Sequence, residues 1–214
     1  KLGARPEELN ITDPALIEGI HGQYAAAGSR IVNANTFGAS AHKLAGSAYT
    51  LEQVITAGIE NCKRACAPYG ALTALDVGPL GELLEPSGTL AFEDAVAEYA
   101  RIVKAGEAAG ADLIFFETYT DLYELKAALL AAKENTHLPI LASMSFEAGG
   151  RTFTGCTVES FAASARGLGA DAVGINCSLG PKEIFPMAKR LAEAVPGNFP
   201  VFVKPNAGLP RADG

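Results

Sequence analysis

A cysteine stands at the end of an expected strand in the last third of the chain, within the segment 174–181, which reads GINCSLGP. The apolar residues before it predict a buried strand, and the proline after it predicts the first turn of a helix. In barrel-type α/β proteins the loops that follow the strands build the active site. A thiolate in such a loop can bind a metal ion or attack a substrate. Cys177 is therefore the first candidate for a chemical role.

Glu117 is the second candidate, because it follows the apolar run 113–116. A carboxylate at the mouth of an apolar strand is costly unless a cation pairs with it. The cation could be the ammonium group of a substrate. It could equally be a protein side chain, such as Lys204 at the end of another expected strand. From these residues alone both alternatives stay open.

Five further polar side chains stand at expected strand ends. They could hydrogen-bond a substrate carboxylate or orient a ligating cysteine. They could equally satisfy the backbone of the adjoining loops, which Asn and Ser often do. These candidate substrate-binding residues are Asn35, Thr36, Ser143, Ser145 and Asn176.

The elements that must position these residues recur along the chain. The segments 24–37, 107–118 and 166–177 each combine a helix end, a glycine stop and a short apolar strand that ends in polar residues. Three more strands are expected at 72–77, 139–146 and 200–204. The strand starts lie roughly 30 to 40 residues apart, as successive βα units require.

The intervening helices carry recognisable start signals. Asp13 and Pro14 predict one helix start, and the segments 50–53 and 121–124 look like capping boxes. Further helices are expected at 91–109, 122–135, 158–166 and 183–195. Strands that are apolar on both faces and alternate with helices imply a parallel sheet with helices outside it.

Six βα units could form a doubly wound sheet or a (β/α)8 barrel that is short of two strands. A doubly wound sheet concentrates polar strand ends at one crevice, whereas a barrel brings every strand end to one mouth. Here every expected strand ends in small or polar residues, and no glycine-rich phosphate-binding motif follows a strand. We therefore expect an α/β protein with a (β/α)8 TIM-type barrel, formed by residues 1–214 as one domain.

Composition limits the other classes of function. The net charge is −7 and the 17 basic residues form no run, so neither nucleic acid nor an anionic membrane is an expected partner. The apolar runs are too short to span a bilayer, and no signal-type stretch follows Lys1, so a cytoplasmic location is expected.

Cys62 and Cys66 are expected to be buried on one helix face. The three histidines are expected at surface or loop positions.

Six segments together carry a family resemblance, because they occur in order through essentially the whole chain. They resemble motifs of the homocysteine S-methyltransferase family, and within it most closely the homocysteine-binding domain of the cobalamin-dependent methionine synthases. The segments are NTFG at 35–38, DVGPLG at 76–81, FET at 116–118, GRTFTG at 150–155, GINCSLGP at 174–181 and KPNAGLP at 204–210.

The resemblance implies a (β/α)8 barrel that holds one zinc ion on three cysteine thiolates. Cys177 matches the first ligand, and Glu117 matches the glutamate that binds the substrate amino group. The other two ligands form an adjacent pair in a Gly-Gly-Cys-Cys motif, which this sequence lacks, so they are expected beyond Gly214. The first barrel strand is likewise expected before Lys1, so the chain would contain strands two to seven.

The implied activity is a zinc-dependent transfer of a methyl group to homocysteine, with its thiol activated as a zinc thiolate. The expected donor is methylcobalamin, charged from methyltetrahydrofolate on cobalamin- and folate-binding domains of the same or a partner chain. A betaine- or S-methylmethionine-dependent enzyme is an alternative. A non-catalytic binding or scaffold module is another, motivated by the missing cysteine pair. A barrel enzyme with Cys177 as nucleophile would need a neighbouring base, and the sequence offers no obvious one.

Overall fold

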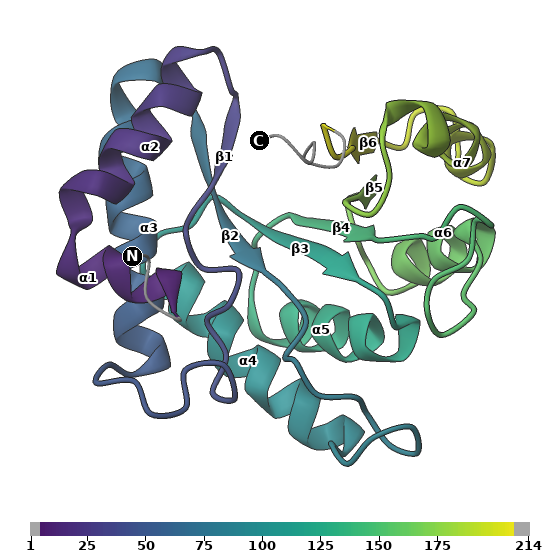
Figure 1. Ribbon diagram of the computed structural model, residues 1–214, viewed down its shortest axis with the longest axis horizontal. Helices are drawn as coiled ribbons and strands as arrows, with labels where there is room; N and C mark the ends of the chain where they lie inside the picture. Colours follow the sequence, from purple (N-terminus) through teal and green to yellow (C-terminus); the bar gives the residue numbers. More distant parts are fainter. Residues whose placement is uncertain (1–4, 208–214) are drawn as a thin grey trace, which may run out of the picture.

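The computed structural model describes residues 5–207; residues 1–4 and the last part of the 204–210 segment lie outside it. Six parallel strands form one sheet in the order β1-β2-β3-β4-β5-β6. The sheet curls into an arc, so that β1 and β6 lie at its two ends (Figure 1). The strands are β1 Ile31–Asn33, β2 Leu72–Val77, β3 Leu113–Tyr119, β4 Ile140–Met144, β5 Ala172–Asn176 and β6 Val201–Lys204.

The helices lie on the outer side of this arc (Figure 1). Those that follow the first strand connect consecutive strands, which makes each connection a βα unit and explains the parallel pairing. The helices are α1 Leu9–Thr12, α2 Pro14–Ala26, α3 Leu51–Cys66, α4 Phe92–Ala108, α5 Leu122–Asn135, α6 Val158–Gly167 and α7 Pro181–Glu193, with short 3₁₀ turns η1 Pro6–Glu8 and η2 Ala67–Tyr69. The expected α/β architecture is confirmed as six strands of a TIM-type barrel.

The expected strand positions are confirmed, and the helix boundaries differ from expectation by one or two residues. The largest shift concerns the range 183–195: α7 begins at Pro181, as that proline itself predicted, because proline supplies the first helical residue without needing a hydrogen-bond donor. No helix within residues 5–207 is long and apolar enough to cross a membrane.

Alternating side chains of each strand serve two different cores. Ile114 and Phe116 of β3 point outward into the main core between sheet and helices. Leu113 and Phe115 point inward, where Phe115 meets Phe202 with ring centroids 5.1 Å apart. The inward side chains nearest the strand ends are polar, so the arc has an apolar floor and a polar mouth.

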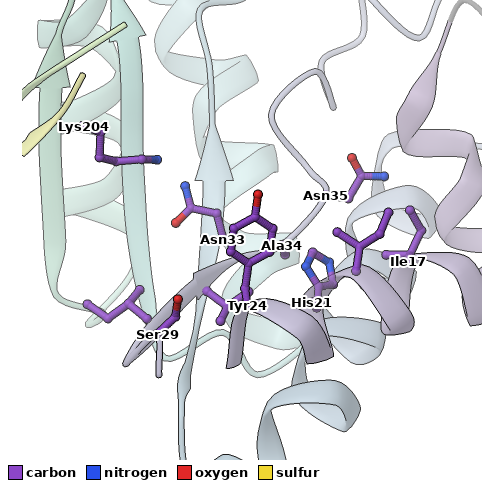
Figure 2. A pocket seen from close by; sticks show the side chains of 11 residues that line it. Ile17, His21, Tyr24, Ser29, Asn33, Ala34, Asn35 and Lys204 are labelled. Atoms are coloured by element: carbon purple, nitrogen blue, oxygen red, sulfur yellow. The ribbon is translucent and has the colours of Figure 1, made fainter. Parts of the chain in front are cut away.

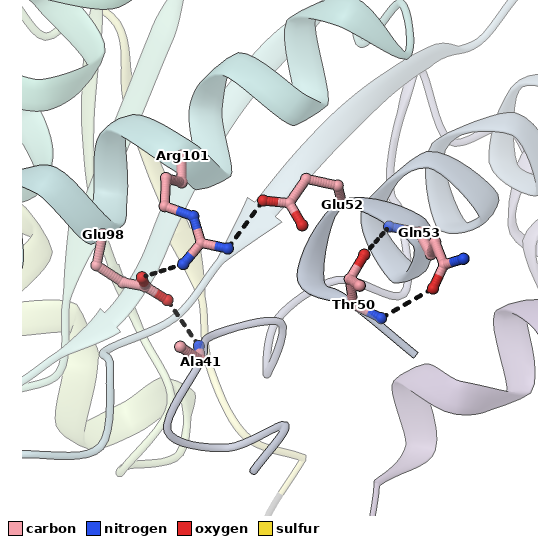
Figure 3. Close-up of polar contacts among 6 residues, drawn as sticks. All are labelled: Ala41, Thr50, Glu52, Gln53, Glu98 and Arg101. Atoms are coloured by element: carbon pink, nitrogen blue, oxygen red, sulfur yellow. Dashed lines mark hydrogen bonds and ion pairs between the residues drawn. The ribbon is translucent and has the colours of Figure 1, made fainter. Parts of the chain in front are cut away.

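The capping box predicted at the start of α3 is confirmed (Figure 3). The Thr50 hydroxyl accepts from the Gln53 N–H at 3.2 Å, and the Gln53 amide oxygen accepts from the Thr50 N–H at 2.9 Å. Beside it, the Arg101 guanidinium of α4 bridges Glu52 of α3 and Glu98 of α4. These ion pairs are half-exposed, so each is worth about 0–1 kcal/mol.

The reciprocal capping box predicted at 121–124 is wrong. Asp121 does cap α5, because its carboxylate accepts from the Tyr123 N–H at 2.9 Å. Glu124 instead turns into the protein, where its Oε1 accepts from the Leu80 N–H at 2.7 Å and from the Tyr99 hydroxyl at 2.9 Å. A buried backbone donor and a buried phenol compete more strongly for that carboxylate than an exposed helix end does.

The surface position predicted for His21 is also wrong. His21 lies on the face of α2 that packs toward β1, and it is only 6% exposed. Burial lowers the pKa of this imidazole, so its neutral form is favoured. His42 and His137 are exposed outside the helices and strands, as expected.

Candidate active site at the strand ends

The inward-facing residues at the carboxyl ends of five strands form a polar layer. In the strand register Asn176 pairs with Lys204, whereas Asp76 pairs with Phe115, two residues before Glu117, and Ser143 pairs with Gly174, two residues before Asn176. This layer, called the mouth layer below, consists of Asp76 of β2, Glu117 of β3, Ser143 of β4, Asn176 of β5 and Lys204 of β6.

Cys177 begins the turn that leaves β5 for α7, and the backbone of this turn is unusual. Cys177 and Ser178 have φ angles of 62° and 60°, in the left-handed region that L side chains rarely adopt. The Cys177 N–H donates to the carbonyl of Lys204 at 3.1 Å, and its carbonyl accepts from the Leu179 N–H at 2.7 Å. The turn is therefore fixed against β6, with the cysteine only partly buried.

Asn176 ties together the ends of three strands. Its Oδ1 accepts from the Thr118 N–H at 3.0 Å and from the Ser143 hydroxyl at 2.8 Å, while its Nδ2 donates to the Thr118 hydroxyl at 2.7 Å. The Ser145 hydroxyl donates to the Asn176 carbonyl at 2.8 Å. Because all these groups are committed to one another, this network holds the residue before Cys177 in place.

Thr118 explains how β3 changes direction at the mouth. It has a φ of 67°, and the register of β3 with β4 shifts between Phe116 and Tyr119. Such a bulge re-aims the side chains that follow it. Tyr119 would face inward by strict alternation, but it lies in the outer core and its hydroxyl donates to the Gly78 carbonyl at 3.2 Å. Glu117 stays the last inward-facing residue of β3.

Glu117 pairs with a protein cation in this structure. The Lys204 ammonium lies 2.6 Å from Glu117 Oε2, and the same nitrogen lies 4.7 Å from the centre of the Phe115 ring. The Glu117 side chain is 15% exposed, whereas that of Lys204 is 48% exposed. The protein partner considered from the sequence is therefore present, and the carboxylate faces the mouth.

Asp76 is the most deeply buried acid of the mouth layer. Burial, and secondly the negative charge of Glu117, hold the pKa of its carboxyl well above the usual range. Its Oδ1 is buried without a hydrogen-bond partner among residues 5–207. In the sequence this residue stands in the DVGPLG segment at 76–81, and its role stayed undecided. Its inward position at a strand end, two residues before a Gly-Pro turn, is the signal that could have placed it among the candidate site residues.

Asn35 and Thr36 lie in the loop after β1 and use their polar atoms to hold the scaffold. The Asn35 amide donates to the Pro6 carbonyl and to Asn10 Oδ1, both at 2.9 Å. The Thr36 hydroxyl donates to the Asp76 carbonyl at 2.8 Å and accepts from the Asp76 N–H at 3.1 Å. Thr36 thus positions Asp76, and a substrate role for either residue stays a prediction.

A cavity of about 480 Å³ lies between α2, β1 and the Lys204 side chain (Figure 2). Its walls are mainly apolar, with Ile17, Ile20 and Ile31 among the lining residues. His21 Nε2 and Asn33 Nδ2 are buried there without hydrogen-bond partners among the described residues. The cavity runs along the edge of β1 that pairs with no strand in the described sheet, and Lys204 reaches it from β6.

The metal-binding capacity of residues 5–207 is limited. They contain no group of three or more His, Cys, Asp or Glu side chains placed to hold a metal ion. Cys177 could supply one ligand, but a zinc site needs three or four. The described residues therefore do not make a zinc site by themselves.

The fold and the mouth layer define an α/β barrel protein whose candidate site lies at the carboxyl ends of its strands. The family model for homocysteine S-methyltransferase matches residues 3–214, and the chain belongs to that family. It is 31% identical over 218 residues to the methionine synthase of Mycobacterium tuberculosis, and 31% identical over 220 residues to that of Mycobacterium leprae. Each match covers 95% of this chain but only 18% of the relative.

Among solved structures, the metallated form of the homocysteine methyltransferase MmuM from Escherichia coli has the same fold. Its TM-score is 0.83 at 22% identity, covering 94% of this chain and 75% of that one. The oxidised form of the same protein matches with a TM-score of 0.84, covering 97% of this chain and 77% of that one. The recognised resemblance to the family is thus confirmed.

Proposed function

We propose that this chain binds homocysteine and presents its thiol for methylation, as one domain of a methionine-forming methyltransferase. The observation that carries the proposal is the Cys177 turn. A partly exposed cysteine is held in a left-handed conformation at the barrel mouth, with Glu117 in the same layer. Left-handed backbone costs about 1–3 kcal/mol per residue and persists at functional sites where it is needed.

Zinc is part of this proposal, with Cys177 as one ligand and two further thiolates expected beyond Gly214. A zinc ion bound there would supply Lewis acidity, which favours the thiolate form of a coordinated thiol at neutral pH. Thiols ordinarily titrate near pH 8.5, so the reactive form is otherwise scarce. The chain's own contribution would be to hold Cys177 rigidly through the Lys204 carbonyl and the Asn176 network.

The other mouth residues would orient the amino acid part of the substrate. The Glu117 carboxylate would accept hydrogen bonds from the substrate ammonium. Asn176, Ser143 and Ser145 would keep the ends of β3, β4 and β5 in register. Asn35 and Thr36 would act by positioning the loop after β1 and the end of β2.

The methyl donor is proposed to be methylcobalamin, carried and recharged from methyltetrahydrofolate on separate domains. The support is the 31% identity to two methionine synthases, of which this chain matches 18%. A betaine- or S-methylmethionine-dependent enzyme is the second candidate. A cytoplasmic location belongs to the same proposal.

Zinc content and homocysteine binding of the intact natural protein test the proposal. We expect about one zinc per chain, lost in Cys177→Ser and retained in Cys156→Ser. Cys156 is a matched control because it is also partly buried, outside the mouth layer, with its Sγ hydrogen-bonded to the Thr157 carbonyl. An intact protein with neither zinc nor homocysteine affinity would contradict the proposal and favour a non-catalytic binding or scaffold module.

A further inference from the structure

The mouth layer contains one ammonium group and two carboxyl groups. Lys204 pairs with Glu117 at 2.6 Å, whereas Asp76 Oδ1 is buried with no hydrogen-bond partner among residues 5–207. A buried carboxyl oxygen without a partner is expensive to maintain, at roughly 1–3 kcal/mol, and native structures seldom leave one without a purpose.

The backbone of Asp76 is fixed, so its side chain cannot leave the layer easily. Its N–H and its carbonyl both bond to the Thr36 hydroxyl, at 3.1 and 2.8 Å. The charged groups that act on it come from three elements: Glu117 of β3 and Glu7 of η1 raise the pKa of its carboxyl, and Lys204 of β6 lowers it. The Asn33 amide of β1 also favours the ionised form.

Lys204 is the movable member of this group. Its side chain is 48% exposed and ends in a compact charge on a flexible four-carbon stem. Figure 2 shows it extending from β6 toward Asn33, on the side of the cavity along β1. The same ammonium is thus bonded to Glu117, and its positive charge also acts on the Asp76 carboxyl.

We propose that the ammonium group of the bound amino acid displaces Lys204 from Glu117, and that Lys204 then pairs with Asp76, whose carboxyl releases its proton to solvent. This inference rests on the proposed function, because it takes homocysteine as the molecule that carries the ammonium. Asp76 becomes a positioning residue: it acts through Lys204 and does not touch the reacting sulfur.

The exchange balances in charge. Before binding, Glu117 and Lys204 neutralise each other and Asp76 is protonated. After binding, the substrate ammonium neutralises Glu117 and Lys204 neutralises the Asp76 carboxylate, while the O–H bond of Asp76 breaks and the proton passes to the buffer. Every buried charge is paired in both states, which avoids the large cost of an isolated ion. A ligand without an ammonium group cannot drive the exchange, so the site would select amino acids.

The test counts the protons released when L-homocysteine binds to the intact protein, by calorimetry in buffers of different ionisation enthalpy between about pH 5 and 8. The homocysteine thiol contributes its own proton in every variant, so differences between variants isolate Asp76. We expect Asp76→Asn to release about one proton fewer than the native protein at the pH of maximal release. The native count should also fall by about one when 4-mercaptobutanoate, which lacks the ammonium group, replaces homocysteine.

Two variants make the result decisive. Lys204→Met should release the same reduced number of protons as Asp76→Asn, because the cation that ionises Asp76 is gone. If Asp76→Asn does not fold, Lys204→Met tests the exchange in its place. Glu134→Gln, an exposed carboxylate at the end of α5, should match the native protein. If Asp76→Asn and Lys204→Met bind homocysteine and release as many protons as the native protein, the exchange is overturned while the proposed function stands. Absence of homocysteine binding by the native protein would overturn both.

Discussion

Asn176 and Thr118 hold each other by two hydrogen bonds across the barrel mouth, although β4 lies between their strands. The Thr118 N–H donates to Asn176 Oδ1 at 3.0 Å, and Asn176 Nδ2 donates to the Thr118 hydroxyl at 2.7 Å. The pair links the bulge of β3 to the residue before the Cys177 turn. The pair therefore fixes the residues that adjoin Glu117 and Cys177 in the sequence.

Asn176→Ala should destabilise the fold by about 1–3 kcal/mol, because it leaves the Thr118 N–H and the Ser143 hydroxyl without their shared acceptor. Urea unfolding measures the change, and homocysteine affinity should fall with it. Asn135→Ala is the control, since the Asn135 amide makes one hydrogen bond, to the Ala131 carbonyl within α5. An equal loss of unfolding free energy in Asn176→Ala and Asn135→Ala would contradict the role of Asn176 as a shared hydrogen-bond acceptor.

Gly174→Ala should destabilise the barrel floor by about 1–3 kcal/mol, as overpacking of a core does. A Cβ at this position would lie 2.3 Å from the nearest ring carbon of Phe202, which packs on Phe115. Adding Phe202→Leu should recover part of the loss. Gly197→Ala, where a Cβ meets nothing within 4 Å, should leave the free energy of unfolding nearly unchanged. An unchanged free energy of unfolding in Gly174→Ala would show that the Phe202 ring is not held in place.

Glu124→Gln should change how stability depends on pH. Burial raises the pKa of the Glu124 carboxyl in the folded state. The stability that this group contributes is therefore complete below its unfolded pKa and is lost as pH rises through its folded pKa. A glutamine oxygen can still accept from the Leu80 N–H and the Tyr99 hydroxyl.

Over that pH range, the Glu124→Gln variant should gain stability relative to the native protein, as measured by urea unfolding at a series of pH values. Glu124→Leu should instead lose about 2–4 kcal/mol, because two buried donors then lack an acceptor. If the free energy of unfolding changes with pH in the same way in the native protein and in Glu124→Gln, the raised pKa of Glu124 is refuted.

The four cysteines should differ sharply in reactivity toward iodoacetamide. Burial, foremost, raises the pKa of the Cys62 thiol to about 12, and Cys66 lies beside it with the two Sγ atoms 3.8 Å apart. Since only the thiolate reacts, Cys62 should not be modified in the folded protein at neutral pH, and Cys66 should be protected because it is only 1% exposed. Mass spectrometry should find Cys177 labelled first, and all four labelled in urea. Labelling of Cys62 at the rate of Cys177 would contradict this order.

Much of the fold could be predicted from the sequence because its signals are local. Apolar runs bounded by glycines placed the six strands, and Asp13, Thr50 and Pro181 marked helix starts through the hydrogen-bonding needs of a helix end. The same logic failed at Glu124 and His21. Both lie on helix faces whose burial depends on neighbouring elements, and no local pattern records that burial.

The sequence by itself determined that Cys177 follows a strand and that Glu117 follows the apolar run of another, since both facts depend only on the order of apolar and polar residues. The tertiary structure decided which groups meet. Lys204 reaches Glu117 across 87 positions, Asp76 is buried beside them, and a bulge turns Tyr119 outward while Glu117 stays inward. These outcomes depend on strand register and on the curvature of the sheet, which arise only when segments distant in the sequence pack together.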